Sequence, residues 1–118
     1  MAQIKRTGAY LDIVLTPFEK LMALHRGVRV PLSSITAVNV VERPLDEVQG
    51  FRAPGLHVPS RHKIGPWRAS GRRTFAVARA QQTAVRIDLD DGKYDTLIIS
   101  VPDAAAVAQD IRTAPAQR

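Results

Sequence analysis

Hydrophobic and polar residues alternate along several short stretches of this chain, a pattern typical of half-buried β-strands. In AYLDIVLT, every second residue from Leu11 to Leu15 is apolar, so these side chains share one face of a first predicted strand. VRVPLSSITAVNVVE predicts a short strand at 28–30 and another near 36–42, separated at Pro31 because proline donates no ladder hydrogen bond. Further along, TFAVAR predicts that β-structure resumes.

The clearest predicted element is a hairpin, AVRIDLDDGKYDTLIISV, in which two alternating strands flank the turn dipeptide Asp91–Gly92. The inward faces of the two strands consist of Val85, Ile87 and Leu89, then Leu97, Ile99 and Val101. Four acidic residues lie on the polar side of this hairpin, where we expect solvated charges rather than catalytic carboxylates: Asp88, Asp90, Asp91 and Asp95.

The two remaining segments differ in how clearly their pattern can be interpreted. DAAAVAQDIRT predicts a C-terminal helix with Asp103 near its start and one apolar stripe made of Ala104, Val107, Ala108 and Ile111. The segment 17–25 fits a helix capped by Thr16, but it also alternates like a strand. Its β-rich neighbours favour the strand, and the pattern leaves both open.

Several strands followed by one amphipathic helix predict a mainly β protein, an antiparallel barrel or sandwich of about seven strands with a C-terminal α-helix. LTPFEKLMALHRGVRVPLSSITAVNVVE resembles the opening of bacterial pleckstrin-homology-like (PH-like) domains. FRAPG, GPWRASGRRTFAVAR and DGKYDTLIISVPDAAAVAQDI are similar to small members of uncharacterised function. The resemblance implies a PH-like domain at 9–114, between an N-terminal tail at 1–8 and a C-terminal tail at 115–118.

This resemblance implies a binding or scaffolding role without fixing a ligand, because one fold hosts many functions. Relatives that bind phosphoinositides carry a basic motif in the loop between the first two strands. The corresponding loop here, around residues 16–19, has only Lys20 nearby. A site of that type is therefore not expected, and the positive charge lies elsewhere.

The formal charge of +6 is unevenly distributed along the chain. Residues 48–87 contain many Arg and Lys and no acid, whereas 88–110 contain many acids and only Lys93 as a base. Such blocks can attract anions to one face, pair between copies of the chain, or neutralise one another as neighbouring strands.

The strongest candidate site is the basic segment 52–73, RAPGLHVPSRHKIGPWRASGRR, which we expect to be a long loop or irregular. The residues predicted to contact an anion or a lipid are Arg61, Lys63, Trp67, Arg68, Arg72 and Arg73. The arginines surround Ser70–Gly71, whose backbone N–H groups would line a concavity for a phosphate. Trp67 would insert at a membrane interface, or else fold back over an open barrel edge in a loop that is merely soluble.

Other function classes find little support in the residues. No hydrolase, nucleotide-binding or dinucleotide-binding motif occurs, so we expect neither an enzyme nor a cofactor. There is no cysteine, and the spacing of His25, His57 and His62 fixes no metal geometry, so no metal is expected. Nucleic-acid binding is not expected either, because the few aromatic residues are needed in the core.

The chain lacks an apolar run long enough for a membrane span or a signal peptide. We therefore expect a cytoplasmic protein, with attachment to a membrane surface as an open alternative. The sequence predicts a non-catalytic binding or scaffolding domain that contacts anionic lipid through its basic segment. The alternative is a protein–protein interaction or self-association module without a lipid role, bound to an unknown protein partner or to other copies of the chain.

Overall fold

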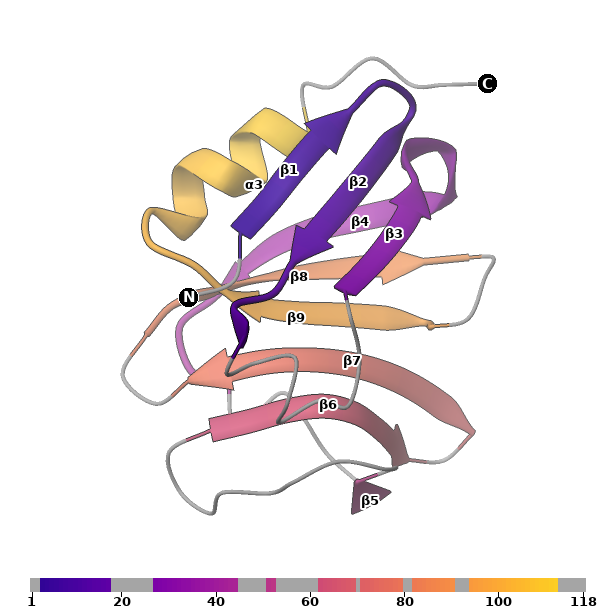
Figure 1. The fold of residues 1–118 in the computed structure, drawn as a ribbon, viewed down its shortest axis with the longest axis vertical. Helices are drawn as coiled ribbons and strands as arrows, with labels where there is room; N and C mark the ends of the chain where they lie inside the picture. Colours follow the sequence, from indigo (N-terminus) through magenta and orange to yellow (C-terminus); the bar gives the residue numbers. More distant parts are fainter. Residues whose placement is uncertain are drawn as a thin grey trace.

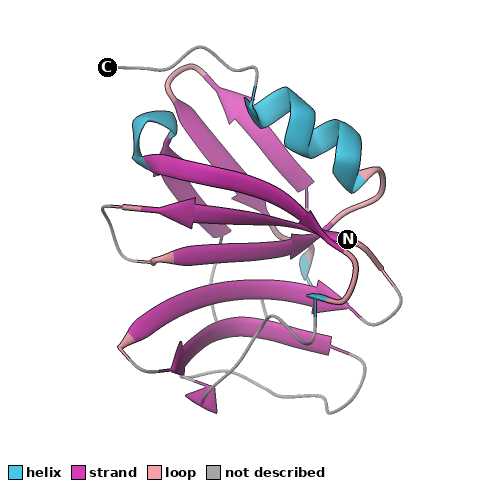
Figure 2. Ribbon diagram, turned by 180° about the vertical axis from the view of Figure 1, so that it is seen from behind, coloured by secondary structure: helices cyan, strands magenta, loops and turns pink. Residues whose placement is uncertain are grey.

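The computed structural model describes residues 3–17, 27–44, 51–52, 62–69, 71–79, 82–90 and 94–112, which form two β-sheets and one helix (Figures 1 and 2). The smaller sheet has the order β1-β2-β3, with β1 (Gln3–Thr7), β2 (Tyr10–Val14) and β3 (Gly27–Pro31). A short 3-10 turn, Leu32–Ser34, leads from β3 into the larger sheet.

The larger sheet has six strands in the order β4-β8-β9-β7-β6-β5. Its strands are β4 (Ile35–Val41), β5 (Phe51–Arg52), β6 (His62–Ala69), β7 (Arg72–Arg79), β8 (Ala84–Leu89) and β9 (Thr96–Ser100). The chain is therefore mainly β, as predicted, and its described residues form nine strands against about seven expected.

The main hydrophobic core lies between the two sheets. The alternation of the first predicted strand is confirmed, since Leu11, Ile13 and Leu15 are all buried. They share one cluster with Phe75 of β7 and Ile87 of β8, which come from the facing sheet. Burial of apolar surface between two such layers is the dominant stabilising contribution in a domain of this size.

The predicted C-terminal helix is also confirmed and completes this core. Helix α3 (Ala104–Arg112) buries Ala104, Ala108 and Ile111 against β4 and β8 (Figure 2). At its end, Arg112 donates hydrogen bonds from Nε and Nη2 to the carbonyl oxygen of Val38, at 3.0 and 2.6 Å. The helix is thereby fixed to the terminal strand of the larger sheet.

The N-terminal residues depart from the expected tail at 1–8. Residues 3–7 form strand β1, which pairs antiparallel with β2 through a turn in which Gly8 has φ +58°. Glycine accepts this conformation without strain, and a glycine in the first central position suits a two-residue hairpin turn. Lys5 lies opposite Asp12, an opposite-charge pair that favours the strand despite its low hydrophobicity.

The predicted hairpin at 84–101 is confirmed in its register, which places Val85 opposite Ile99 and Ile87 opposite Leu97. Its turn dipeptide, Asp91–Gly92, lies outside the described residues. The expectation of a purely antiparallel sheet is wrong at one place, because β9 runs parallel to β7. Since β9 lies between β8 and β7 and is buried on both faces, its central residues 97–99 are all apolar, as is common in parallel strands.

The basic segment is more regular than expected. Within 52–73, strand β6 covers residues 62–69 and pairs antiparallel with β7, whose first residues are Arg72 and Arg73. Gly65 and Pro66 make this strand difficult to predict from the sequence, because both residue types usually weaken the interior of a strand. On its other side, β6 pairs with β5 at Trp67 and Arg68, and the pairing of described residues on that side does not include Pro66.

Two predictions fall on parts of the chain that the structure does not describe. The choice between helix and strand for 17–25 concerns residues outside the described part from 18 onward. The same holds for residues 53–61 of the basic segment, which include His57 and Arg61.

Candidate anion-binding site

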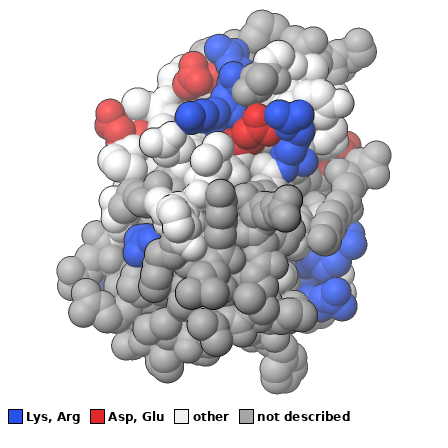
Figure 3. Space-filling view, viewed as in Figure 1, with Lys and Arg blue, Asp and Glu red and all other residues white. Residues whose placement is uncertain are grey.

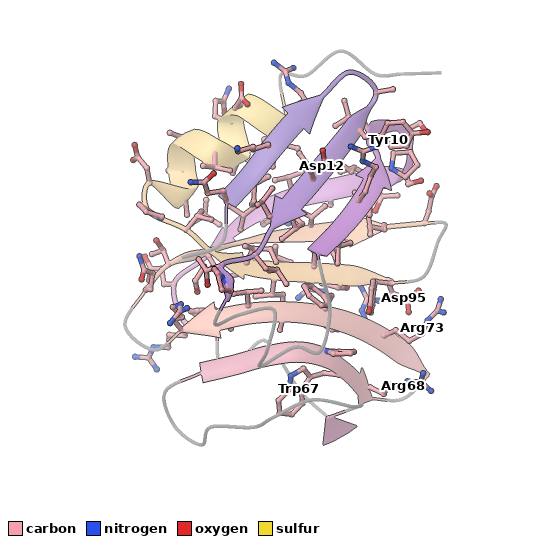
Figure 4. All side chains as sticks on the ribbon, in the orientation of Figure 1. Tyr10, Asp12, Trp67, Arg68, Arg73 and Asp95 are labelled. Carbon is pink, nitrogen blue, oxygen red and sulfur yellow. The ribbon has the colours of Figure 1, made fainter. Side chains whose placement is uncertain are left out.

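The structure brings four of the six predicted site residues to one end of the larger sheet, where β6 turns into β7. Arg68 lies near the end of β6, and Arg73 lies near the start of β7 (Figure 4). Arg72 is the first residue of β7. Trp67 precedes Arg68 in the same strand. Of the other two, Arg61 lies outside the described residues, and Lys63 is described only as a backbone position of β6, opposite Ala78.

Trp67 is a buried residue with an exposed fraction of 5%. It belongs to a second apolar cluster, on the face of the larger sheet opposite the main core, together with Ala76, Ala78, Ala84 and Ile98. The small alanine side chains of β7 and β8 leave room for the indole ring in this cluster. The ring therefore has a packing role, and its burial leaves it no surface for the insertion into a membrane that we considered from the sequence.

Arg68 and Arg73 lie directly opposite each other on neighbouring strands and share one face of the sheet (Figure 4). Arg68 is exposed, and none of the ion pairs found within the described residues involves it. In the same orientation, Figure 3 shows Lys and Arg side chains at the surface of this end. Two like charges in this relation repel each other unless a nearby anion compensates them.

Asp95 compensates Arg73 from the loop that precedes β9. Its Oδ2 accepts a hydrogen bond from the backbone N–H of Arg73 at 2.8 Å and lies 3.7 Å from Arg73 Nε. The backbone N–H of Asp95 donates in turn to the carbonyl oxygen of Arg73, at 2.8 Å. Asp95 is thus a fixed structural partner, which differs from the solvated charge expected from the sequence.

Arg72 points to the opposite face of the sheet, where it contacts β8 and β9. Its Nε donates to Thr96 Oγ1 at 2.9 Å, and its Nη2 donates to Asp88 Oδ1 at 3.1 Å. Arg86 Nε donates to the same carboxylate oxygen at 3.2 Å. Asp88 is also no solvated turn charge, because its carboxylate joins two arginines and a threonine.

These contacts join the basic block 48–87 of the sequence to the acidic block 88–110. Within the described residues, arginines from the basic block pair with Asp88 and Asp95 from the acidic block inside one molecule. Asp88 contacts Arg72 and Arg86, and Asp95 contacts Arg73. Arg68 is exposed at the same end of the sheet and adds a positive charge there.

The pKa of Tyr94, a residue of the main core, is affected by the arginines at this end of the sheet. Its ring lies 5.4 Å from the ring of Phe75, centroid to centroid, and it is buried. Burial raises the pKa of the Tyr94 phenol, whereas the nearby Arg73 and Arg68 lower it. The two arginines therefore favour the charged form of the phenol, and burial favours the neutral form.

The site residues predicted from the sequence did not include several residues that contact the arginines of this site or their carboxylate partners, namely Arg86, Asp88, Asp95 and Thr96.

The described residues contain no group of three or more His, Asp or Glu side chains arranged to hold a metal ion. Exposed guanidiniums can bind an anion through charge-assisted hydrogen bonds, since each presents several N–H donors in one plane. This is the chemistry that the arrangement offers.

Comparison of the chain with protein-family models, with curated proteins and with solved structures gave no match. Among the described residues, no helix has both the length and the apolar character required to cross a membrane.

Proposed function

We propose that this chain is a non-catalytic binding domain of PH-like architecture that contacts an anionic lipid surface through the end of the β6–β7 hairpin. The observation that carries the proposal is the exposed Arg68, placed directly opposite Arg73. The strand pair places these two arginines side by side, and Arg68 presents its charge at the surface beside the Arg73–Asp95 ion pair. A cytoplasmic domain attached to the periphery of a membrane is the setting that suits such a contact.

The magnitude of the expected effect follows from the charges. A basic residue near an anionic membrane contributes about 1 kcal/mol to binding. Reversing the charge of one such residue therefore costs about 2 kcal/mol, which corresponds to roughly 30-fold in affinity. Because the attraction decays over about 8 Å at physiological salt, only charges near the contact have this effect.

Arg43 provides a matched control for Arg68. It is exposed and follows β4 at the end where Val41 lies opposite Ala84, so it lies at the far end of the larger sheet from the hairpin turn. Arg68→Glu and Arg43→Glu change the net charge of the protein equally. Only the first removes a charge from the proposed surface.

The experiment is co-sedimentation of the full chain with neutral vesicles and with vesicles that contain phosphatidylglycerol. We expect binding to the anionic vesicles only, weakened by salt, reduced roughly 30-fold by Arg68→Glu and changed less than about twofold by Arg43→Glu. Equal losses in the two variants, or a wild-type protein that stays in the supernatant with both vesicles, would contradict the proposal.

A protein-interaction role is the second candidate, and it draws on a different surface. On the outer face of the smaller sheet, Tyr10 is 43% exposed and Val14 is 41% exposed. Arg29 lies 5.3 Å from the centroid of the Tyr10 ring and forms an ion pair with Asp12. Tyrosine and arginine are enriched among residues that dominate protein interfaces, so an alanine at Tyr10 would abolish binding under this alternative.

A further inference from the structure

We infer that Arg72 and Arg86 form a binding site for a phosphate monoester, and that Asp88 is the positioning residue that holds both guanidiniums in place. The inference rests on the proposed function and specifies a ligand for the same end of the sheet. It concerns the face that carries Trp67, opposite to that of Arg68 and Arg73.

The geometry centres on one oxygen atom. Asp88 Oδ1 accepts from Arg72 Nη2 at 3.1 Å, from Arg86 Nε at 3.2 Å and from Thr96 Oγ1 at 3.2 Å. Thr96 is 1% exposed, so its hydroxyl is a buried and fixed member of this network. Arg72 Nε also donates to Thr96 Oγ1, at 2.9 Å, which restrains the orientation of its guanidinium plane.

Both arginines contact this one carboxylate, and the side chains of both remain accessible to a ligand. The side chains of Arg72 and Arg86 are 50% and 32% exposed, whereas that of Asp88 is only 22% exposed. A solvent-borne anion therefore meets the guanidiniums more readily than the carboxylate. The network keeps two long side chains together, which reduces the entropy lost when they bind a common ligand.

The charge and shape of the site favour a phosphate monoester. Such a group carries about two negative charges near neutral pH and three terminal oxygens, so it can accept from two guanidiniums at once. A phosphodiester carries one charge and fewer terminal oxygens, and it gains less from a second arginine. The monoester can belong to a lipid headgroup such as phosphatidic acid or to free phosphate.

The role of Asp88 separates this inference from general attraction to a basic surface. Asp88→Asn makes the protein more positive, so attraction that depends only on charge would strengthen. If Asp88 positions the two arginines, the same substitution weakens recognition of the monoester, because a neutral amide oxygen holds the guanidiniums more weakly than the carboxylate does. Arg86→Lys keeps the charge and removes the planar fork, and Arg43→Lys is its control on an exposed arginine at the far end of the sheet.

The experiment measures co-sedimentation with vesicles that contain phosphatidic acid or phosphatidylglycerol at equal surface charge, with inorganic phosphate as a soluble competitor. We expect the wild type to prefer phosphatidic acid at least tenfold. Asp88→Asn and Arg86→Lys should both abolish the preference, while Arg43→Lys retains it. Competition by inorganic phosphate would assign the site to the phosphate group alone, and resistance to it would assign the site to the lipid headgroup.

The failure of this inference is distinguishable from that of the proposed function. Equal binding to the two vesicle types, or stronger binding by Asp88→Asn, would overturn the monoester site and leave the anionic contact through Arg68 intact. Absence of binding to either vesicle would overturn both. If Asp88→Asn is not folded by circular dichroism, Arg86→Lys decides, because it leaves the contact between Arg72 and Asp88 in place.

Discussion

Arg68 and Arg73 lie directly opposite each other across the β6–β7 hairpin, a pairing of like charges on one face of the sheet. Asp95 compensates Arg73 through a hydrogen bond and an ion pair, while Arg68 is exposed beside them. A pairing of this kind lowers the stability of the free protein and favours the binding of an anionic ligand. It relates the stability of the hairpin to its proposed function.

Removal of the Arg68 charge should stabilise the fold while it weakens binding. Like charges directly opposite each other on neighbouring strands destabilise by about 0.2–1 kcal/mol. We therefore expect Arg68→Gln to raise the free energy of unfolding by an amount in this range, measured by urea denaturation at low salt. The gain should shrink at high salt, and a loss of stability at both salt concentrations would contradict this account of the pair.

Asp95 should contribute more to stability than its neighbour Asp90. Asp95→Asn weakens the contacts with the backbone N–H and the guanidinium of Arg73, and charge-assisted hydrogen bonds of this kind are worth about 1.5–3 kcal/mol. Asp90→Asn is the matched control, because Asp90 is exposed and changes by less than about 0.5 kcal/mol are expected there. Equal effects in urea unfolding would show that the Asp95 contacts contribute nothing.

Gly71 should be sensitive to substitution for a conformational reason. Its φ is +77°, and a Cβ at this position would meet no atom within 4 Å. Gly71→Ala therefore tests backbone strain alone, with an expected loss of about 1–2 kcal/mol. Asparagine tolerates this conformation better than alanine, so Gly71→Asn should lose less. An alanine variant as stable as the wild type in thermal unfolding would refute the strained turn.

The fluorescence of Trp67 should be insensitive to membranes. It is the only tryptophan in the chain, and it is buried in the second apolar cluster. We expect emission at short wavelength in the free protein and no further blue shift on addition of anionic vesicles that bind the protein. A clear blue shift on binding would instead place the ring in the membrane, which was one of the two alternatives that the sequence left open for Trp67.

The burial of Tyr94 gives the stability a pH dependence in alkaline solution. Because the pKa of Tyr94 is raised in the folded state, the unfolded chain releases the phenolic proton first as the pH rises. The contribution of Tyr94 to stability is therefore complete below the reference pKa of 10.0 and is lost as the pH rises through the folded pKa.

Tyr94→Phe should remove this alkaline loss, measured as the slope of unfolding free energy against pH. A second measurement uses absorbance titration in a Tyr10→Phe background, which leaves Tyr94 as the only phenol. There, Arg73→Gln should raise the pKa of Tyr94 further, since Arg73 lowers it in the wild type. A fall in that pKa would show that Arg73 acts on Tyr94 in another way.

The sequence predicted those elements whose periodicity is strong and local. The alternation at Leu11–Leu15, the hairpin at 84–101 and the apolar stripe of α3 all appear where expected. Strand β1 was missed because QIKRT contains a single large apolar residue, and β6 was missed because Gly65 and Pro66 interrupt its pattern. In both cases, pairing with a neighbouring strand compensates for a weak local signal.

The sequence grouped Arg68, Arg72 and Arg73 in one basic segment, and the structure places them at one end of the larger sheet. The sequence could not predict the partners of these arginines, because those depend on strand order. Arg72 meets Asp88 and Thr96 only because β9 lies between β7 and β8, a parallel arrangement that the sequence pattern does not encode. Pairing over such separations is set by the register of the whole sheet.

The central claim is that the β6–β7 hairpin end contacts an anionic surface, and amide NMR mapping tests it most directly. Uniformly labelled protein is mixed with lipid nanodiscs that contain phosphatidylglycerol, and the attenuation of each backbone amide signal is measured. We predict strong attenuation at Arg68, Gly71 and Arg73 and none at Asn39–Val41. Attenuation confined to Tyr10–Val14, or uniform attenuation over the whole chain, would contradict the account.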